Sequence, residues 1–125
     1  MLNFWLVGVG GFFGAIARYG VSQAIQSFIP HPFPLHTLIV NFTGCLAIGV
    51  LYEYLRDHPL LPTASLVIAV GFLGAYTTFS AFSLETIQLI RSSSPGLAFA
   101  NVAGSLILCL AAVALGMWIG NFIRV

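Results

Sequence analysis

The sequence predicts an all-α integral membrane protein whose chain crosses the membrane four times. Only 6% of its 125 residues are charged and 59% are hydrophobic, whereas a soluble domain carries about 25% charged residues. Three stretches, 19–52, 58–84 and 92–123, contain no charged residue, and each exceeds the ~20 residues that a spanning helix needs. This composition argues against a soluble enzyme. A net charge of +1 argues against a nucleic-acid partner, because electrostatic binding needs a basic stripe.

We expect a single transmembrane domain, 1–125, with four helices joined by short connectors. The helices are predicted at roughly 2–28, 36–55, 63–91 and 97–123. The connectors are a proline-rich segment, a charged loop and a serine-rich turn, at 29–34, 56–62 and 92–96. Proline fixes φ and removes a hydrogen-bond donor, so a helix does not continue through the first two. No basic region precedes the first apolar run, and we therefore interpret it as a retained helix rather than a signal peptide.

Two pairs of glycines spaced four residues apart predict close contacts between helices. Gly10 and Gly14 lie on the first predicted helix, and Gly116 and Gly120 lie near the end of the fourth. Small residues at this spacing let helix backbones approach closely in lipid. We therefore expect both pairs to lie in helix interfaces.

The third predicted helix is interrupted by an unusual run of small and hydroxyl residues. Gly71 and Gly74 precede two threonines and two serines within 77–83. The hydroxyls can bond back to their own helix, in which case the glycines are packing contacts. Alternatively the helix is broken here and its freed carbonyls line a cavity or hold an ion, since irregular backbone at membrane depth occurs only in such places.

The distribution of arginine across the two membrane faces is nearly balanced. With four spans, Arg56 and Arg124 lie on one side, whereas Arg91 and Arg18 lie on or toward the other. Orientation is set by the asymmetry of basic residues near span ends. We hypothesise that the chain inserts in both orientations and that oppositely inserted copies pair as an antiparallel dimer.

Two polar positions within the first two spans are candidates for an ion path. Arg18 either snorkels to the headgroups or stands at an aqueous vestibule, where it would attract anions. Asn41 shares a helix face with Thr37, four residues earlier. Its amide either bonds to a neighbouring helix or forms a polar pore wall and donates to an anion.

An aromatic pair and a polar stripe lie on the last two predicted helices. Phe79 and Phe82 are three residues apart and are flanked by the hydroxyls of Ser80 and Ser83. The pair either packs in the core or turns its rings toward a track, where the partially positive ring edges would attract an anion weakly. The stripe on the fourth helix consists of Asn101, Ser105 and Cys109.

The side chains give little support for catalysis or for a side-chain metal site. No nucleophile, base and orienting residue occur together; Glu85 stands alone, whereas Glu53 and Asp57 look interfacial. Cys45 and Cys109 fall inside spans and are predicted to be buried free thiols. The histidines are expected at loops or span ends in solvated positions, and they are His31, His36 and His58.

Three motifs follow one another along the first three predicted helices. They are Gly10-Gly11-x-x-Gly14-Ala15-x-x-Arg18-Tyr19, Asn41-Phe42-x-Gly44, and Gly74-x-x-Thr77-Thr78-Phe79-Ser80-x-Phe82-Ser83-x-Glu85. The first two are weak alone, but the third is specific. Together they span nearly the whole chain, which resembles the small bacterial fluoride channels of the Fluc family, also called CrcB.

The resemblance implies a multi-pass protein of the bacterial inner (plasma) membrane that is not an enzyme. It implies an antiparallel, dual-topology homodimer in membrane lipid, with two pores that export fluoride passively from the cytoplasm and relieve its toxicity. By position, Phe79 and Phe82 resemble the pore phenylalanines, Asn41 the pore asparagine and Arg18 the vestibule arginine. Four more residues of this chain resemble positions along the family's pore, and they are Thr37, Ser80, Ser105 and Cys109.

The resemblance also implies a structural sodium ion at the dimer centre and no organic cofactor. The third helix would be broken mid-span, and the backbone carbonyls of Gly74 and Thr77 from both subunits would hold the ion. The sequence departs from the family pattern at a few positions, namely His36, Ala75, Tyr76, Ala81 and Asn101.

Two other classes of function are compatible with the sequence pattern. A small proton-coupled drug exporter needs a carboxylate within the membrane, for which Glu85 is the candidate. A structural subunit without transport would use the polar residues as contacts between helices.

Overall fold

The computed structural model describes residues 1–57 and 61–124 and is built from helices alone in this part of the chain. The elements are α1 (Leu2–Phe28), α2 (Leu35–Tyr54), α3 (Leu61–Ala64), the π-helix η1 (Ser65–Leu73), α4 (Gly74–Tyr76), α5 (Phe79–Arg91) and α6 (Pro95–Ile123). Four continuous or interrupted helices are long and apolar enough to cross a membrane: Leu2–Phe28, Leu35–Tyr54, Pro62–Arg91 and Pro95–Ile123. Each lies within one or two residues of the bounds predicted from sequence. His58 falls outside the described residues.

The ends of the spans follow from proline and from one left-handed residue. The prolines of the 29–34 connector separate α1 from α2, which begins directly after Pro34. After α5, Ser93 takes a φ of 58°, a left-handed conformation that is uncommon outside glycine. The chain then enters α6 with Pro95 in its first turn, where its missing N–H costs no helix hydrogen bond.

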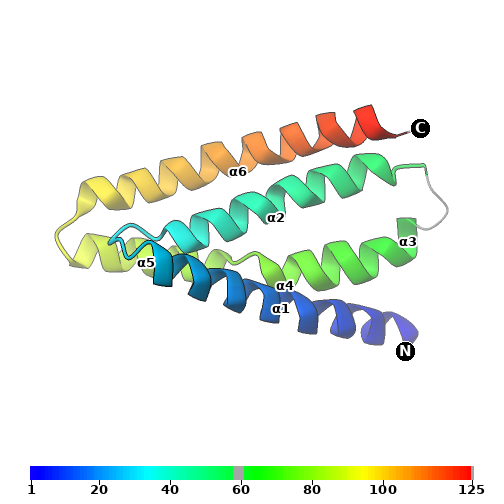
Figure 1. The fold of residues 1–125 in the computed structure, drawn as a ribbon, viewed down its shortest axis with the longest axis horizontal. Helices are drawn as coiled ribbons and strands as arrows, with labels where there is room; N and C mark the ends of the chain where they lie inside the picture. Colours follow the sequence, from blue (N-terminus) through cyan, green and yellow to red (C-terminus); the bar gives the residue numbers. More distant parts are fainter. Residues whose placement is uncertain (58–60, 125) are drawn as a thin grey trace.

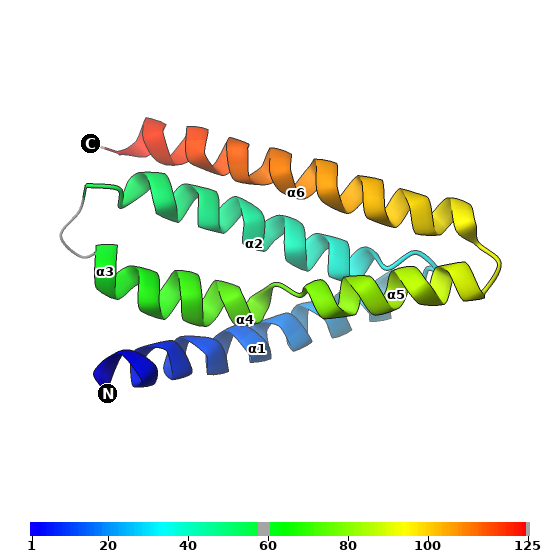
Figure 2. The same ribbon diagram turned by 180° about the vertical axis from the view of Figure 1, so that it is seen from behind.

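The spans form an antiparallel bundle with both termini at one end (Figures 1 and 2). α2 packs along α6, α1 packs along η1, and α2 lies between α6 and the interrupted third span. The opposite end holds the 29–34 connector and the turn between α5 and α6. Residues near the middle of each span therefore meet at the same depth.

Glycines set the closest approaches between these helices. A Cβ added at Gly10 or Gly14 would clash with backbone carbonyls of η1, which belong to Val67 and Phe72. Gly116 and Gly120 likewise lie against the backbone of α2. Both predicted glycine pairs are therefore confirmed as contacts between helix backbones.

The end that holds the termini carries the charged residues of the 56–62 loop and of the C-terminus. Arg124 Nη1 lies 3.0 Å from Asp57 Oδ2, and Arg56 Nη1 lies 3.0 Å from Glu53 Oε1. Arg18 and Arg91 lie toward the other end, as predicted from the four-span topology. The two ends of the described chain therefore carry two arginines each.

The third span is broken in its middle, at Thr77 and Thr78. α4 ends at Tyr76; Thr77 (ψ 156°) and Thr78 (ψ 115°) are extended, and α5 then begins at Phe79. The wide helix η1 before the break was not predicted, and π-helical turns occur frequently at functional sites. Of the two interpretations that the residues left open, the broken helix is confirmed.

Candidate functional site

Two cavities meet at the break in the third span. The central cavity has a volume of about 400 Å³ and lies among α2, η1, α5 and α6, near the middle of the spans. The end cavity has a volume of about 540 Å³ and lies among α1, α2 and α5, toward the 29–34 connector. Thr78 lines both cavities, so the break stands between them.

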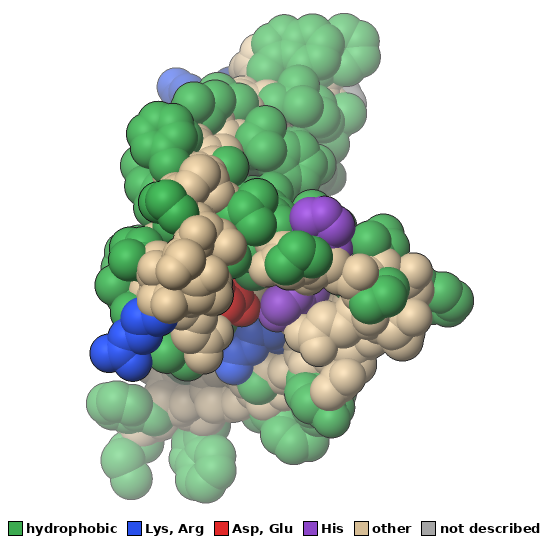
Figure 3. All heavy atoms as spheres, turned by 90° about the vertical axis from the view of Figure 1, so that its left-hand side faces the viewer, with side chains coloured by type: hydrophobic (Ala, Val, Ile, Leu, Met, Phe, Trp, Pro, Cys, Tyr) green, Lys and Arg blue, Asp and Glu red, His purple; other side chains and the backbone are tan. Residues whose placement is uncertain are grey.

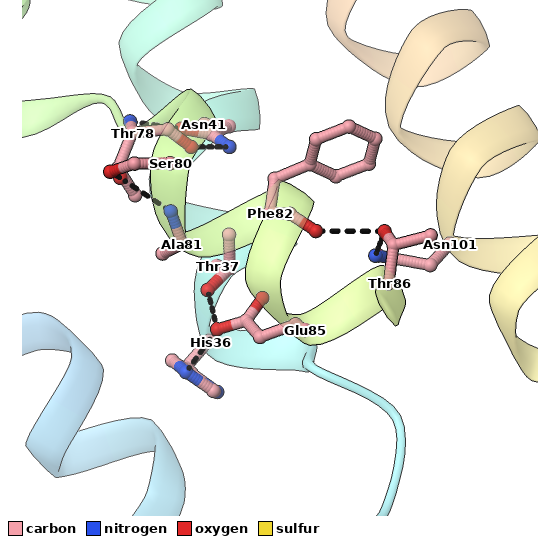
Figure 4. Close-up of polar contacts among 10 residues, drawn as sticks. All are labelled: His36, Thr37, Asn41, Thr78, Ser80, Ala81, Phe82, Glu85, Thr86 and Asn101. Carbon is pink, nitrogen blue, oxygen red and sulfur yellow. Dashed lines mark hydrogen bonds and ion pairs between the residues drawn. The ribbon is translucent and has the colours of Figure 1, made fainter. Parts of the chain in front are cut away.

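The side chain of Asn41 holds the broken backbone in place (Figure 4). The N–H of Thr78 donates to Asn41 Oδ1 at 2.7 Å, and Asn41 Nδ2 donates to the Thr78 carbonyl at 3.0 Å. One amide side chain thus satisfies both backbone polar groups of an extended residue, which would otherwise be costly at membrane depth. An amide nitrogen carries two hydrogens, so one N–H of Asn41, which also lines the central cavity, is not used by this contact.

The break removes helix donors from the backbone carbonyls just before it, and those of Gly74 and Thr77 are two of them. In a continuous helix the N–H of Thr78 would donate to the Gly74 carbonyl, but here it donates to Asn41. The N–H of Ala81 would likewise donate to the Thr77 carbonyl, but here it donates to Thr78 Oγ1 at 3.2 Å. Unwound carbonyls of this kind coordinate sodium in transporters, so the oxygens of Gly74 and Thr77 fit the expected cation.

No cluster of three histidine, cysteine or acidic side chains that could hold a metal occurs in residues 1–57 and 61–124.

The aromatic pair borders the central cavity. The ring centroids of Phe79 and Phe82 are 5.4 Å apart with an angle of 41° between the planes, and both residues line the cavity. Phe79 is 76% exposed in the single chain, so the cavity is open on this side. Ser105 and Cys109 line it from α6.

The thiols of Cys45 and Cys109 are free and only partly buried. They were expected to be buried. Their exposure follows from the central cavity, which both residues line.

Asn101 ties α6 to α5 beside Phe82. The residue is 1% exposed, and its Nδ2 donates to Thr86 Oγ1 at 2.9 Å, which donates to the Phe82 carbonyl at 2.7 Å (Figure 4). Ser83 Oγ similarly donates to the Phe79 carbonyl at 2.9 Å. These polar groups serve the helices themselves rather than a cavity.

The end cavity combines a basic, an acidic and an imidazole side chain. Arg18 lines it from α1, and no ion pair of Arg18 occurs in the described part of the chain. Glu85 Oε1 accepts from Thr37 Oγ1 at 2.6 Å and lies 3.2 Å from His36 Nε2. Figure 3 shows this end of the molecule, where a red acidic side chain lies between purple histidine and blue basic side chains.

All ten residues that the resemblance assigns to the pore, the vestibule and the sodium site line one of the two cavities. Seven line the central cavity: Asn41, Gly74, Thr77, Phe79, Phe82, Ser105 and Cys109. Three line the end cavity: Arg18, Thr37 and Ser80. The structure thus gathers them around a single break, which spacing alone did not show.

Sequence reasoning gave too little weight to three residues of the site. Thr78 caps α5 by accepting from Ala81, and a threonine ahead of a helical pattern is a recognisable cap signal. Glu85 is a carboxylate within a span, which is itself a signal of function. His36 was expected in a solvated position, but it lies half-buried beside Glu85.

Comparison with known proteins identifies relatives over nearly the whole chain. Residues 5–117 match the family described as "CrcB-like protein, Camphor Resistance (CrcB)". A protein of Bacillus cereus named "Fluoride-specific ion channel FluC 1" is 40% identical over 98% of this chain and 90% of its own. Proteins named "Fluoride-specific ion channel FluC" are 42% identical in Magnetococcus marinus, over 94% of this chain and 96% of theirs, and 43% identical in Hydrogenobaculum sp., over 98% and 100%.

Proposed function

This chain belongs to the CrcB-like family, and we propose that it is a fluoride-specific ion channel rather than an enzyme. The observation that carries the proposal is the broken third span, which places hydrogen-bond donors and an aromatic pair around a cavity at membrane depth. Relatives at 40–43% identity that bear the name of fluoride-specific ion channels support the choice of ion.

The proposed path runs from the end cavity past the break into the central cavity. Arg18 draws anions into the end cavity, because an unpaired positive charge raises the local concentration of anions. Thr78 Oγ1 and Ser80 Oγ lie 3.3 Å apart, and their mutual contact uses only one of the two hydroxyl protons. The other proton is available to a passing anion at the junction of the cavities.

Fluoride is strongly hydrated, and a dry path must replace its lost water with other donors. In the central cavity these are the second N–H of Asn41 and the ring edges of Phe79 and Phe82. Ring edges carry partial positive charge, but they bind more weakly than a charged group would. Conduction requires such weak sites, because the ion must leave as readily as it enters.

We also propose that two copies assemble as an antiparallel dimer with two pores. No more than 22% of the most apolar part of each span is buried within one chain, and Phe79 and Gly74 are exposed beside the break. Broken backbone does not face lipid, so a second protein surface would cover it. The equal number of arginines at the two ends of the described chain supports insertion in both orientations.

A structural sodium ion completes this proposal. The carbonyls of Gly74 and Thr77 have lost their helix donors, and two copies would supply four such oxygens around one axis. When bound there, the ion would add a fixed positive field that favours anions nearby. The proposed setting is the bacterial inner membrane, where passive conduction releases fluoride that has accumulated in the cytoplasm.

Fluoride efflux from liposomes tests the proposed function directly. Purified protein is reconstituted with fluoride and chloride inside, and the release of each anion is followed with an ion-selective electrode. Fast fluoride release without chloride release is expected. Folded protein that releases no fluoride above protein-free liposomes would refute the channel and would redirect attention to proton-coupled exchange at Glu85.

A further inference from the structure

The end cavity contains a histidine–carboxylate pair for which the proposed conduction path gives no role. His36 Nε2 lies 3.2 Å from Glu85 Oε1, with the two side chains 22% and 17% exposed. Thr37 donates to the same carboxylate oxygen at 2.6 Å. The imidazole is thus part of the cavity wall, held in a fixed contact, rather than a solvated group at the membrane surface.

The second oxygen of Glu85 makes this pair unusual. Glu85 Oε2 is buried and has no hydrogen-bond partner in the described part of the chain, a situation that is costly for a carboxylate. The charge of Glu85 is therefore balanced through Oε1 alone, by Thr37 and His36. The contact between His36 Nε2 and Glu85 Oε1 is an ion pair when the imidazole holds two protons, and a contact between a neutral ring and a carboxylate when it holds one.

Few other charged or titratable groups face this pair. α1 contributes Arg18 and Tyr19 to the cavity, α2 contributes His36, and α5 contributes Glu85. His31 of the connector lies in a neighbouring pocket of about 390 Å³ that His36 also lines. With a neutral imidazole, the formal charges of Arg18 and Glu85 cancel, and with a charged imidazole the cavity carries a net charge of +1.

We propose that His36 makes the entry of fluoride depend on pH, by adding a positive charge to the end cavity when it gains a proton. This inference rests on the proposed fluoride conduction. Histidine is the side chain whose charge ordinarily changes between pH 5 and 8, and fixed charge lining a cleft can raise the rate of entry of an opposite charge by about 10-fold or more. Fluoride flux therefore rises as the pH falls, in the range where fluoride remains an anion.

The test compares fluoride efflux from liposomes with equal internal and external pH, at about pH 8 and about pH 5.5. Protein-free liposomes are measured at both values, because hydrogen fluoride crosses lipid unaided. In the unmodified protein we expect a rise of about 10-fold on acidification, at the low end of electrostatic steering. His31→Gln is the matched control and should keep this rise, since its imidazole does not line the end cavity.

Two substitutions of His36 separate its charge from its polar contact with Glu85. His36→Gln retains an N–H for Glu85 Oε1 but cannot gain a proton, and it should release fluoride at the slow, high-pH rate under both conditions. His36→Lys keeps a cation at both pH values, and it should release fluoride at the fast rate under both.

The outcomes distinguish this inference from the proposed function. A pH-independent flux in the unmodified protein, or an equal rise in His36→Gln, would overturn the role of His36 while leaving the channel intact. Folded protein without fluoride release at either pH would overturn the channel itself.

Discussion

Replacing Asn41 by aspartate tests whether this side chain faces conducted anions or only supports the break. The substitution keeps an acceptor for the N–H of Thr78, which now lies 2.7 Å from Oδ1. It removes the donor to the Thr78 carbonyl at 3.0 Å and places a negative charge on the wall of the central cavity. The structural cost is one hydrogen bond between helices, about 0.6 kcal/mol on average in membranes, together with about 2.5–3.5 kcal/mol for a charge within a span.

The electrostatic cost to an anion is separate from this structural cost. A cavity of 400 Å³ corresponds to a sphere with a radius of about 4.6 Å, so an ion at its centre lies about 5 Å from the wall. At that separation and an effective dielectric constant of about 20, two unit charges repel by about 3 kcal/mol. We therefore expect fluoride flux in Asn41→Asp to fall by more than about 100-fold at neutral pH.

The assay is fluoride efflux from liposomes, with Asn41→Leu as the matched neutral variant. Leucine removes both hydrogen bonds to Thr78 without adding a charge, and thermal unfolding in detergent shows whether each variant is folded. If Asn41 faces the path, the folded aspartate variant conducts less than the folded leucine variant. Unchanged flux in folded Asn41→Asp at neutral pH would show that Asn41 acts only as a contact between helices.

Three further substitutions address the aromatic pair, the arginine and the glycine interface. Phe79→Ile or Phe82→Ile should reduce fluoride flux about 10-fold or more by removing ring edges while preserving the size-exclusion profile; unaltered flux in both would remove the pair from the path. Arg18→Gln should lower flux about threefold to tenfold at low ionic strength, with a smaller effect at high salt because screening weakens steering; a loss independent of salt would contradict the steering role. Gly14→Val should cost about 1–3 kcal/mol of stability, because its side chain meets the backbone of η1. Gly20→Val is its control, since nothing lies within 4 Å of a Cβ there, and equal thermal stability of the two variants would refute the packing argument.

The bundle could be predicted from sequence because its determinants are local. The length of each apolar stretch fixes a span, and the prolines of the 29–34 connector fix where the first two spans separate. The spacing of Gly10 and Gly14 identified an interface without naming the partner. The identity of the partner helix, η1, could not be predicted, because the sequence of one helix does not determine which backbone carbonyls will pack against its glycines.

From the sequence alone, a broken third span was only one of two possible interpretations. The structure explains why the sequence could not decide between them. A threonine in a membrane helix commonly bonds back to its own turn, and Thr77 Oγ1 does so by donating to the Leu73 carbonyl at 3.0 Å. The adjacent Thr78 instead takes its partner from Asn41, which precedes it by 37 residues. A contact between two spans therefore decides the local conformation, and local pattern could not decide it.

The same contact links the fold to the proposed conduction. Extended backbone inside a membrane is tolerated only where its polar groups find partners, and Asn41 supplies partners for both the N–H and the carbonyl of Thr78. Because one side chain does this, the hydroxyl protons of Thr78 and Ser80 are not needed to satisfy the backbone of Thr78. The carbonyls of Gly74 and Thr77, which the same rearrangement leaves without helix donors, then present negative partial charge beside a path proposed for an anion. A bound cation would offset that charge, so the proposed sodium ion and the proposed anion path both follow from one asparagine–threonine contact. If this reasoning holds, Asn41→Leu should weaken sodium binding as well as conduction, as measured by the dependence of thermal stability on sodium against a larger monovalent cation. Sodium stabilisation that persists in the leucine variant would separate the cation site from the break.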